Sequence, residues 1–232
     1  MQEYNVQILS TNHLSSSLVD EAGEKGIAIE IIPFITTESI LSIEIQQEIE
    51  QLLHEEVTVV FTSSKAVEAV LVHVEETDPN WTIYCVGKHT RELLAEEFGE
   101  EKIMGCAESS ADLAEIILVT DPPEEIFFFC GDRRRDEMLS LLREHDIGVT
   151  ELVVYNTVAV PQKINREFHG ILFFSPSGVE SYFSCNKPGH AILFAIGETT
   201  ASSIRTFTAN HVEIAEEPTK EAIINKVIDY FT

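Results

Sequence analysis

Short apolar runs recur along the chain and alternate with stretches of helical periodicity. Most of the runs are continuous rather than alternating, which is typical of strands that are covered on both faces of a parallel sheet. The runs predicted to be strands are residues 6–9, 27–34, 57–61, 83–86, 126–130, 152–155, 171–174 and 191–196. Apolar residues spaced three or four apart predict helices around Ile45–Leu53, Leu94–Phe98, Leu113–Ile117 and Ile223–Phe231. This alternation predicts the α/β class.

An internal repeat appears in an unusual order. Residues 57–70 resemble residues 169–183, and residues 81–99 resemble residues 190–207. The third central segment, residues 125–155, resembles not a later segment but the start of the chain, residues 4–34. Each pair shares a strand, a turn of small polar residues and a helix. Two similar domains are therefore predicted, although any two strand–helix units share some likeness.

The order of the repeat predicts how the chain divides. A discontinuous α/β domain is expected from residues 1–34 plus 163–232, and an inserted α/β domain from residues 38–154, with linkers 35–37 and 155–162. The chain then crosses twice between the domains. The crossing sequences IIPFITTE and VVYNTVAVP are extended and β-branched, so we expect them to pair as a two-stranded β-ladder hinge.

Polar turns follow five of the predicted strands. Their sequences are Thr62-Ser63-Ser64, Gly87-Lys88-His89-Thr90, Gly131-Asp132-Arg133-Arg134-Arg135, Ser175-Pro176-Ser177-Gly178 and Gly197-Glu198-Thr199-Thr200. Ligands of open parallel sheets bind at the carboxyl ends of the strands, and helix N-termini favour anions. Any one of these turns is explained by ordinary helix capping. Five together favour a cleft that holds a large ligand with several negative charges.

The composition of the chain limits the classes of molecule that it is expected to bind. The 232 residues include 15 Lys and Arg against 40 Asp and Glu, a formal net charge of −25. Such a surface repels phosphate backbones and anionic lipids, so neither nucleic acid nor a membrane is an expected partner. The N-terminus lacks a basic region followed by an apolar run, which favours a cytoplasmic protein. We expect a monomer.

Several kinds of site find no support in the sequence. The four cysteines, Cys85, Cys106, Cys130 and Cys185, contain no CxxC, and no histidine is spaced to complete a zinc site, so we expect reduced thiols and no metal. The chain has no GxGxxG after a strand, no GxxxxGK[ST] and no GxSxG. His89 is the one histidine in a predicted cleft turn, where a solvated side chain is the simpler interpretation.

The turns resemble those of a known family. VFTSSKAV, YCVGKHT, CGDRRRDEM, VVYNTV, FFSPSGV, AIGETTA and EPTKEAI, taken in this order, are similar to the motifs of uroporphyrinogen-III synthase over essentially the whole chain. Each motif is weak alone, and seven in register are specific. The family's fold, two α/β domains joined by a two-stranded β ladder, agrees with the repeat. Ser10-Thr11-Asn12 stands where many relatives carry an arginine.

The resemblance implies a reaction that uses no cofactor. The family takes the linear tetrapyrrole hydroxymethylbilane, removes its terminal hydroxyl and closes the ring with inversion of ring D to give uroporphyrinogen III, a step of haem biosynthesis. Unassisted closure gives the type I isomer, so the protein has to favour one transition state over a facile competitor. The resemblance also implies hydroxymethylbilane synthase as the enzyme that hands over the substrate.

The resemblance assigns roles to particular residues. Tyr155 matches the tyrosine that would donate a proton to the departing hydroxyl, although a strand aromatic at a domain junction also packs there. The positions implied to bind acetate and propionate groups are Thr62, Ser63, Ser64, Gly87, Thr90, Gly131, Arg133, Arg135, Ser175, Ser177, Gly197, Thr199 and Thr200.

Two other functions stay open at this stage. A two-lobed regulatory protein could bind a tetrapyrrole or another polyanion without converting it, and ligand binding without product would favour it. Tandem receiver-like domains would require acidic residues clustered at a strand end, and none is seen. The acidic clusters at residues 48–56, 96–101 and 213–217 lie instead in helical or peripheral segments.

Overall fold

The computed structural model describes residues 6–40, 42–74, 77–120, 122–134 and 137–232. Contacts within the chain divide it into two units, one formed by Met1–Thr36 with Val158–Thr232 and the other by Thr37–Thr157. We call them unit 1 and unit 2. Both consist of a largely parallel sheet with helices on its two faces, so the α/β class predicted from the sequence is confirmed.

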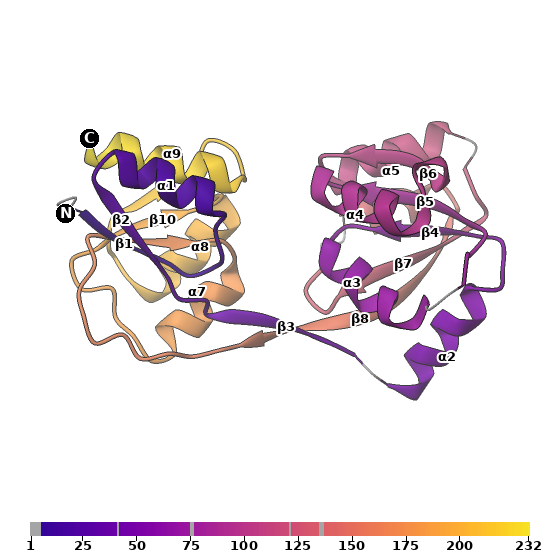
Figure 1. The fold of residues 1–232 in the computed structure, drawn as a ribbon, viewed down its shortest axis with the longest axis horizontal. Coiled ribbons are helices and arrows are strands. Elements are labelled where there is room, and N and C mark those ends of the chain that lie inside the picture. The colour runs from indigo at the N-terminus through magenta and orange to yellow at the C-terminus, as the bar shows by residue number, and fades with distance from the viewer. Residues whose placement is uncertain (1–5, 41, 75–76, 121, 135–136) are drawn as a thin grey trace. The chain divides into compact units, whose positions relative to one another are not determined.

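Unit 1 contains a five-stranded sheet in the order β11-β10-β9-β1-β2, in which all neighbouring strands are parallel. Figure 1 labels β1, β2 and β10 of this sheet. Its strands are β1 (Val6–Ser10), β2 (Ile27–Ile31), β9 (Gly170–Phe173), β10 (Ile192–Ala195) and β11 (Val212–Ile214). One face packs against α7 (Pro176–Phe183) and α8 (Glu198–Phe207). The other packs against α1 (Ser16–Glu24) and α9 (Lys220–Phe231).

Unit 2 contains a six-stranded sheet in the order β3-β8-β7-β4-β5-β6. Its strands are β3 (Ile35–Ser39), β4 (Val57–Phe61), β5 (Trp81–Val86), β6 (Ile103–Ala107), β7 (Glu125–Gly131) and β8 (Gly148–Ala159). Helices α2 (Ile43–Leu52), α3 (Ser64–Val74) and α4 (Lys88–Phe98) pack on one face. Helices α5 (Ser110–Val119) and α6 (Glu137–Glu144) pack on the other, and a 3₁₀ turn spans Glu100–Lys102.

The two sheets repeat each other strand by strand. The order β11-β10-β9-β1-β2 in unit 1 corresponds to β6-β5-β4-β7-β8 in unit 2. The helices correspond too, since α7 and α8 cover the face that α3 and α4 cover in the other unit. The internal repeat predicted from the sequence, with the start of the chain matching residues 125–155, is therefore confirmed.

The predicted pairing of the two crossing sequences is also confirmed, because β3 lies beside β8. The Ile40 amide donates to the Val154 carbonyl at 2.9 Å, and the Val160 amide donates to the Phe34 carbonyl at 2.9 Å. The residue number rises from Phe34 to Ile40 while that of the bonded partner falls from Val160 to Val154, so β3 and β8 are antiparallel. The residues predicted as linkers, 35–37 and 155–162, thus lie largely within strands.

Three features of the fold differ from the sequence prediction. Strands β6 and β11 are not among the predicted runs, because Gly105 interrupts the apolar pattern of β6 and β11 is only three residues long. The predicted strand 27–34 ends at Ile31. Pro33 follows, and a proline cannot donate a ladder hydrogen bond.

Aromatic side chains fill the middle of unit 2. The rings of Phe61 and Phe129, on the neighbouring strands β4 and β7, stack at 5.0 Å between centroids. Trp81 lies 5.8 Å from Phe129, and its indole N–H donates to the Leu52 carbonyl at 2.8 Å. That bond satisfies the buried indole and ties the end of α2 to β5. Burying such a side chain stabilises the fold by about 2–3 kcal/mol.

Candidate active site

Each sheet has one position where the chain leaves two neighbouring strands in opposite directions. In unit 2 the chain goes from β4 toward β5 and from β7 toward β8, and in unit 1 it goes from β9 toward β10 and from β1 toward β2. Ligands of parallel α/β sheets bind at the carboxyl ends of such strand pairs, where two loops separate. The predicted site residues Thr62, Ser63 and Gly131 adjoin the pair in unit 2, and Ser175 adjoins the pair in unit 1.

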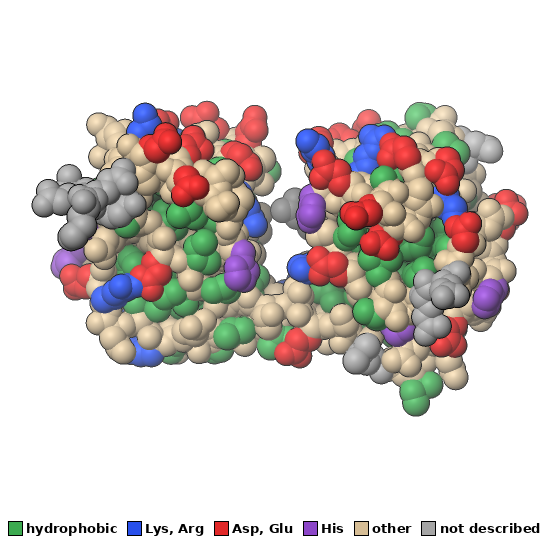
Figure 2. Space-filling view, in the orientation of Figure 1, with side chains coloured by type: hydrophobic (Ala, Val, Ile, Leu, Met, Phe, Trp, Pro, Cys, Tyr) green, Lys and Arg blue, Asp and Glu red, His purple; other side chains and the backbone are tan. Residues whose placement is uncertain are grey.

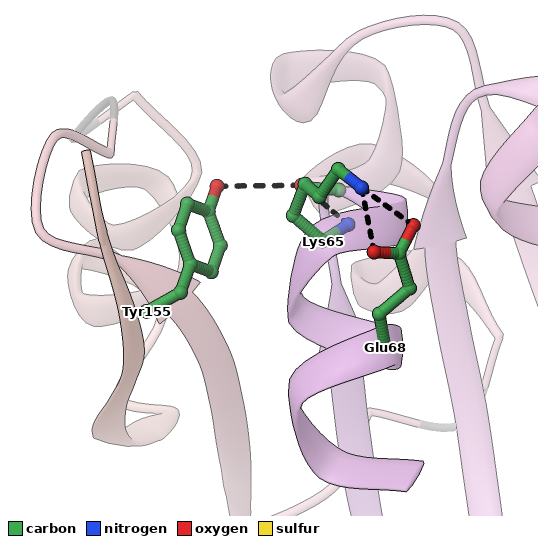
Figure 3. A network of polar contacts seen from close by, with 4 residues as sticks. Lys65, Glu68 and Tyr155 are labelled. Atoms are coloured by element: carbon green, nitrogen blue, oxygen red, sulfur yellow. Dashed lines mark hydrogen bonds and ion pairs between the residues drawn. The ribbon is translucent and has the colours of Figure 1, made fainter. Parts of the chain in front are cut away.

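A polar network occupies the carboxyl edge of unit 2 (Figure 3). Tyr155, half-buried on β8, donates its phenolic hydrogen to Ser63 Oγ at 3.3 Å. The same oxygen accepts the Lys65 amide at 3.0 Å, so Ser63 caps the start of α3. Lys65 continues the network through its ion pair with Glu68 at 2.6 Å. Tyr155 and Ser63, which are 92 residues apart, are thereby brought together.

The arginines after β7 have different surroundings. Arg134 bonds the Glu151 carboxylate on β8, which Arg143 of α6 also contacts at 2.8 Å. The hydrogen bond from Arg134, with a smaller one from Arg143, lowers the pKa of Glu151 below its ordinary value. Arg133 is half exposed, with its Nε 3.9 Å from the Asp132 carboxylate. Arg135 lies outside the described residues.

The corresponding edge of unit 1 is built from hydroxyls. Ser175 is the N-cap of α7 and accepts the Gly178 amide at 3.2 Å, and Pro176 occupies the first turn. Thr11, which follows β1, is buried and donates its hydroxyl to the Leu172 carbonyl of β9 at 2.7 Å. That bond ties the ends of β1 and β9 together.

Several predicted turn residues lie in helices, which corrects the sequence interpretation. Residues 88–90 form the first turn of α4, residues 176–178 that of α7 and residues 198–200 that of α8, while Ser64 is the first residue of α3. The helices start directly after the strands because Gly87 and Gly197 are themselves N-caps. At Gly87 the φ of 86° is one that glycine adopts readily.

The starts of α4 and α8 are alike in the two units. In the described residues, no side chain caps either helix, so the first-turn amides keep their capacity to bind an anion. Thr90 and Thr200 are buried at equivalent positions, while Thr199 and His89 are exposed. Ser177, in the first turn of α7, is half-buried.

Ser10, Thr11 and Asp132 are not among the residues that the sequence implied to bind substrate, although Asp132 lies in one of the predicted polar turns. Ser10 is fully buried and donates to the Asn12 carbonyl at 2.6 Å, so it shapes the turn after β1. Asp132 bonds β8 through its amide and its carboxylate. Their position in the sequence could have identified them, since each residue lies at or just after the end of a strand. At these strand ends the chain leaves two neighbouring strands in opposite directions.

The four cysteine thiols lie at buried or half-buried positions. All four cysteines are free. Burial raises the pKa of Cys130 to about 11, and burial together with the neighbouring Cys106 thiol raises that of Cys85 to about 12. Across the described part of the chain, no three His, Cys, Asp or Glu side chains come together as a metal site, and no helix is long and apolar enough to cross a membrane.

The family model for uroporphyrinogen-III synthase HemD matches residues 16–225 of the chain. The chain belongs to this family. Its activity is that of a cyclising lyase of porphyrin biosynthesis, acting on a tetrapyrrole.

Two solved structures of synthases share the fold. The uroporphyrinogen-III synthetase from Helicobacter pylori is 14% identical with a TM-score of 0.66, and the alignment covers 97% of this chain and 99% of that one. A mutant uroporphyrinogen III synthase from Thermus thermophilus is 15% identical with a TM-score of 0.60 and 97% coverage of both chains. At such identities the likeness supports the fold alone. The search of curated proteins gives no match.

Proposed function

We propose that this protein converts hydroxymethylbilane to uroporphyrinogen III with inversion of ring D. The observation that carries the proposal is the family match over residues 16–225. The carboxyl-edge groups of the two units support it, since they supply hydroxyls and helix N-termini suited to carboxylates. No residue needs to be reactive in itself, because holding a flexible chain in one geometry is chiefly a problem of orientation.

The residues that bind the substrate follow from this chemistry. The first-turn amides of α4 and α8, after Gly87 and Gly197, take acetate or propionate carboxylates, with Thr90 and Thr200 beside them. Hydroxyls, backbone amides and guanidinium groups at the strand ends add short-range contacts. Those residues are Thr62, Ser63, Ser64, Gly131, Arg133, Arg135, Ser175, Ser177 and Thr199.

Tyr155 acts as the proton donor in the first step. The C–O bond of the hydroxymethyl group breaks with its electron pair on oxygen, and the phenolic proton converts the departing hydroxyl to water. The cation left on the terminal pyrrole then accepts an electron pair from the substituted carbon of ring D, which gives a spiro intermediate. The older bond between that carbon and its methylene bridge breaks, the bridge carbon bonds the free α-carbon of ring D, and loss of the proton from that α-carbon completes the inverted ring. The hydrogen bond from Tyr155 to Ser63, 3.3 Å long, supports this role because it is longer than a typical O–H···O bond and is readily exchanged for a substrate oxygen.

The proposal extends to the setting of the protein. Residues 1–34 with 163–232 form one domain, and residues 38–154 form the other. The hinge between them is β3 paired with β8. Four free thiols support a reducing compartment such as the cytoplasm. The protein works as a monomer that receives hydroxymethylbilane from the synthase that makes it.

The test is an isomer-resolved assay with the full chain. Purified protein mixed with fresh hydroxymethylbilane should give mostly the type III product, analysed by chromatography after oxidation to porphyrins. Binding without any change in product would favour a regulatory tetrapyrrole-binding protein instead.

A further inference from the structure

The end of β8 contains a β-bulge beside β7. Strand β7 pairs with β8 residue by residue until Cys130, which lies beside Val153, and the next residue, Gly131, then lies beside Tyr155. Val154 is therefore an extra residue on β8. Bulges bend a strand and redirect the side chains that follow.

The bulge decides the face on which Tyr155 lies. Successive strand residues alternate between the two faces of a sheet. Leu152 and Val154 belong to the core on the α3 face, whereas Val153 packs on the α5–α6 face. Simple alternation would send Tyr155 to the α5–α6 face as well, yet it packs with Val154 on the α3 face. The extra residue thus turns the phenol toward the start of α3.

Gly131 provides the space for the ring. A Cβ added to Gly131 would lie 2.5 Å from both Cε2 and Cζ of Tyr155 and 2.8 Å from its hydroxyl oxygen. Real side chains do not approach so closely, so any other residue here would displace the phenol. Gly131 has no left-handed φ, and its requirement is therefore steric rather than conformational.

Asp132 holds β8 at Tyr155 and two residues beyond it. Its amide donates to the Tyr155 carbonyl at 3.1 Å, and its carboxylate accepts the Thr157 amide at 2.8 Å. The backbone of Tyr155 is thus fixed while its hydroxyl bonds Ser63 Oγ. Figure 3 draws this bond as the dashed line from the Tyr155 hydroxyl. The Tyr155 ring thus lies against Gly131, and the Tyr155 backbone is bonded to Asp132.

We propose that Gly131, together with the bulge at Val154, is a positioning element that aims the Tyr155 hydroxyl for proton donation. The inference rests on the proposed function, because it concerns the donor of that reaction. Gly131 then acts through Tyr155 and touches no reacting atom itself. A methyl group at position 131 would move the phenol by the amount needed to relieve the 2.5 Å contact.

A double-mutant cycle tests the coupling. Gly131→Ala should lower kcat between about tenfold and about a hundredfold with KM within about twofold, since a small misplacement of a catalytic group is costly. Adding Gly131→Ala to Tyr155→Phe should lower kcat by no more than about a further twofold, because the hydroxyl is already gone. Effects that multiply in the double variant would overturn the inference. Gly148→Ala, at the opposite end of β8, is the matched control and should leave kcat unchanged.

Nuclear magnetic resonance separates this inference from the proposed function. In full-length protein with 13Cζ-labelled tyrosine, the Tyr155 resonance is identified by its loss in Tyr155→Phe. It should shift in Gly131→Ala and stay in place in Gly148→Ala, whether or not the protein makes type III product. An unchanged Tyr155 resonance in Gly131→Ala would contradict the inference, whereas absence of type III product from the unmodified protein contradicts only the proposed function.

A rescue variant covers the case in which Gly131→Ala does not fold. Removing the ring in Gly131→Ala/Tyr155→Ala should restore folding, measured by far-ultraviolet circular dichroism, to the level of Tyr155→Ala. Failure of the double variant to fold where Tyr155→Ala folds would show that Gly131 serves something other than the ring, and the inference would be wrong.

Discussion

At the scale of single residues, one phenol has a distinct chemical role in the proposed reaction. Tyr155 is half-buried, and its hydroxyl bonds a serine that is already a helix cap. The surrounding serines and threonines are proposed to make short-range contacts with the substrate carboxylates. Catalysis by orientation spreads its effect over many such contacts, so the proton donor is the residue whose removal has a distinct kinetic signature.

Tyr155→Phe should lower kcat by about a hundredfold, because general acid assistance to the leaving hydroxyl is lost. The type III selectivity of the remaining product should be retained, since the groups that hold the substrate are unchanged. Initial rates and isomer ratios measure both effects. Tyr230→Phe is the control, because Tyr230 lies 43% exposed on α9. Full activity in Tyr155→Phe would exclude the proton-donor role.

Contacts between single residues are also what the sequence alone could not predict. VVYNTV and CGDRRRDEM could be recognised as motifs, yet the pairing of Gly131 with Tyr155 depends on a register shift that no local pattern encodes. The contact between Tyr155 and Ser63 likewise depends on the packing of β8, β7 and α3. Arg134 looked equivalent to its neighbours in sequence, and only its contact with Glu151 distinguishes it.

At the scale of elements, the helix starts combine a structural and a binding role. Ser175 caps α7 beside the proposed site, and Ser109 caps α5 by accepting the Asp112 amide at 3.2 Å. Ser109 is not among the residues proposed to bind substrate. The two serines therefore allow capping and binding to be measured separately.

Ser175→Ala and Ser109→Ala should each lower the free energy of unfolding by about 1 kcal/mol, because each removes a cap. Only Ser175→Ala should raise KM for hydroxymethylbilane. Urea unfolding and steady-state kinetics on the two variants give the comparison. An equal KM for both variants would mean that Ser175 serves only as a cap.

The link between α6 and β8 predicts a pH dependence of stability. Arg134 and Arg143 lower the folded pKa of Glu151, so the carboxylate stabilises the fold above its unfolded pKa of about 4.3. That stabilisation is lost as the pH falls through the folded pKa. Glu151→Gln should therefore unfold more easily than the unmodified protein at neutral pH, by about 1–2 kcal/mol.

The difference between Glu151→Gln and the unmodified protein should shrink as the pH falls below the folded pKa. Thermal unfolding between neutral and acid pH measures it, with Glu144→Gln, an exposed position at the end of α6, as the control. A constant difference at every pH would mean that the ionised carboxylate is not the stabilising group.

Elements were the level at which the sequence was most informative. Continuous apolar runs predicted the long central strands, because both faces of a parallel sheet are buried. β-branched crossing sequences predicted the pairing of β3 with β8. Strand β11, three residues long with Glu213 at its centre, has too little pattern to be predicted and forms because β10 offers a neighbouring edge.

At the scale of the whole molecule, the charge of −25 opposes a substrate that carries eight carboxylates. Acidic side chains are distributed over both units on the face drawn in Figure 2. The clusters at residues 48–56 and 96–101 precede β4 and β6, at the opposite ends of these strands from the proposed site, whereas Glu216 and Glu217 follow β11 at the carboxyl edge of unit 1. Net charge acts through long-range fields, which salt screens beyond about 8–10 Å.

Recognition through amides and hydroxyls predicts a weak salt dependence. KM for hydroxymethylbilane should change by no more than about threefold between about 0.05 and about 0.5 M KCl, because short-range hydrogen bonds are little affected by screening. Steady-state kinetics across that range measures it, with sucrose at matched osmolality as the control. A steep rise of KM with salt would point to a basic binding surface instead.

The most direct measurement is the isomer ratio produced from fresh hydroxymethylbilane by the unmodified protein. Timed samples, oxidised and separated by chromatography, are compared with buffer alone and with heat-denatured protein. The proposed function predicts type III as the main product, at a rate proportional to protein concentration, while both controls give type I. The same type I to type III ratio in all three samples would contradict the proposed function.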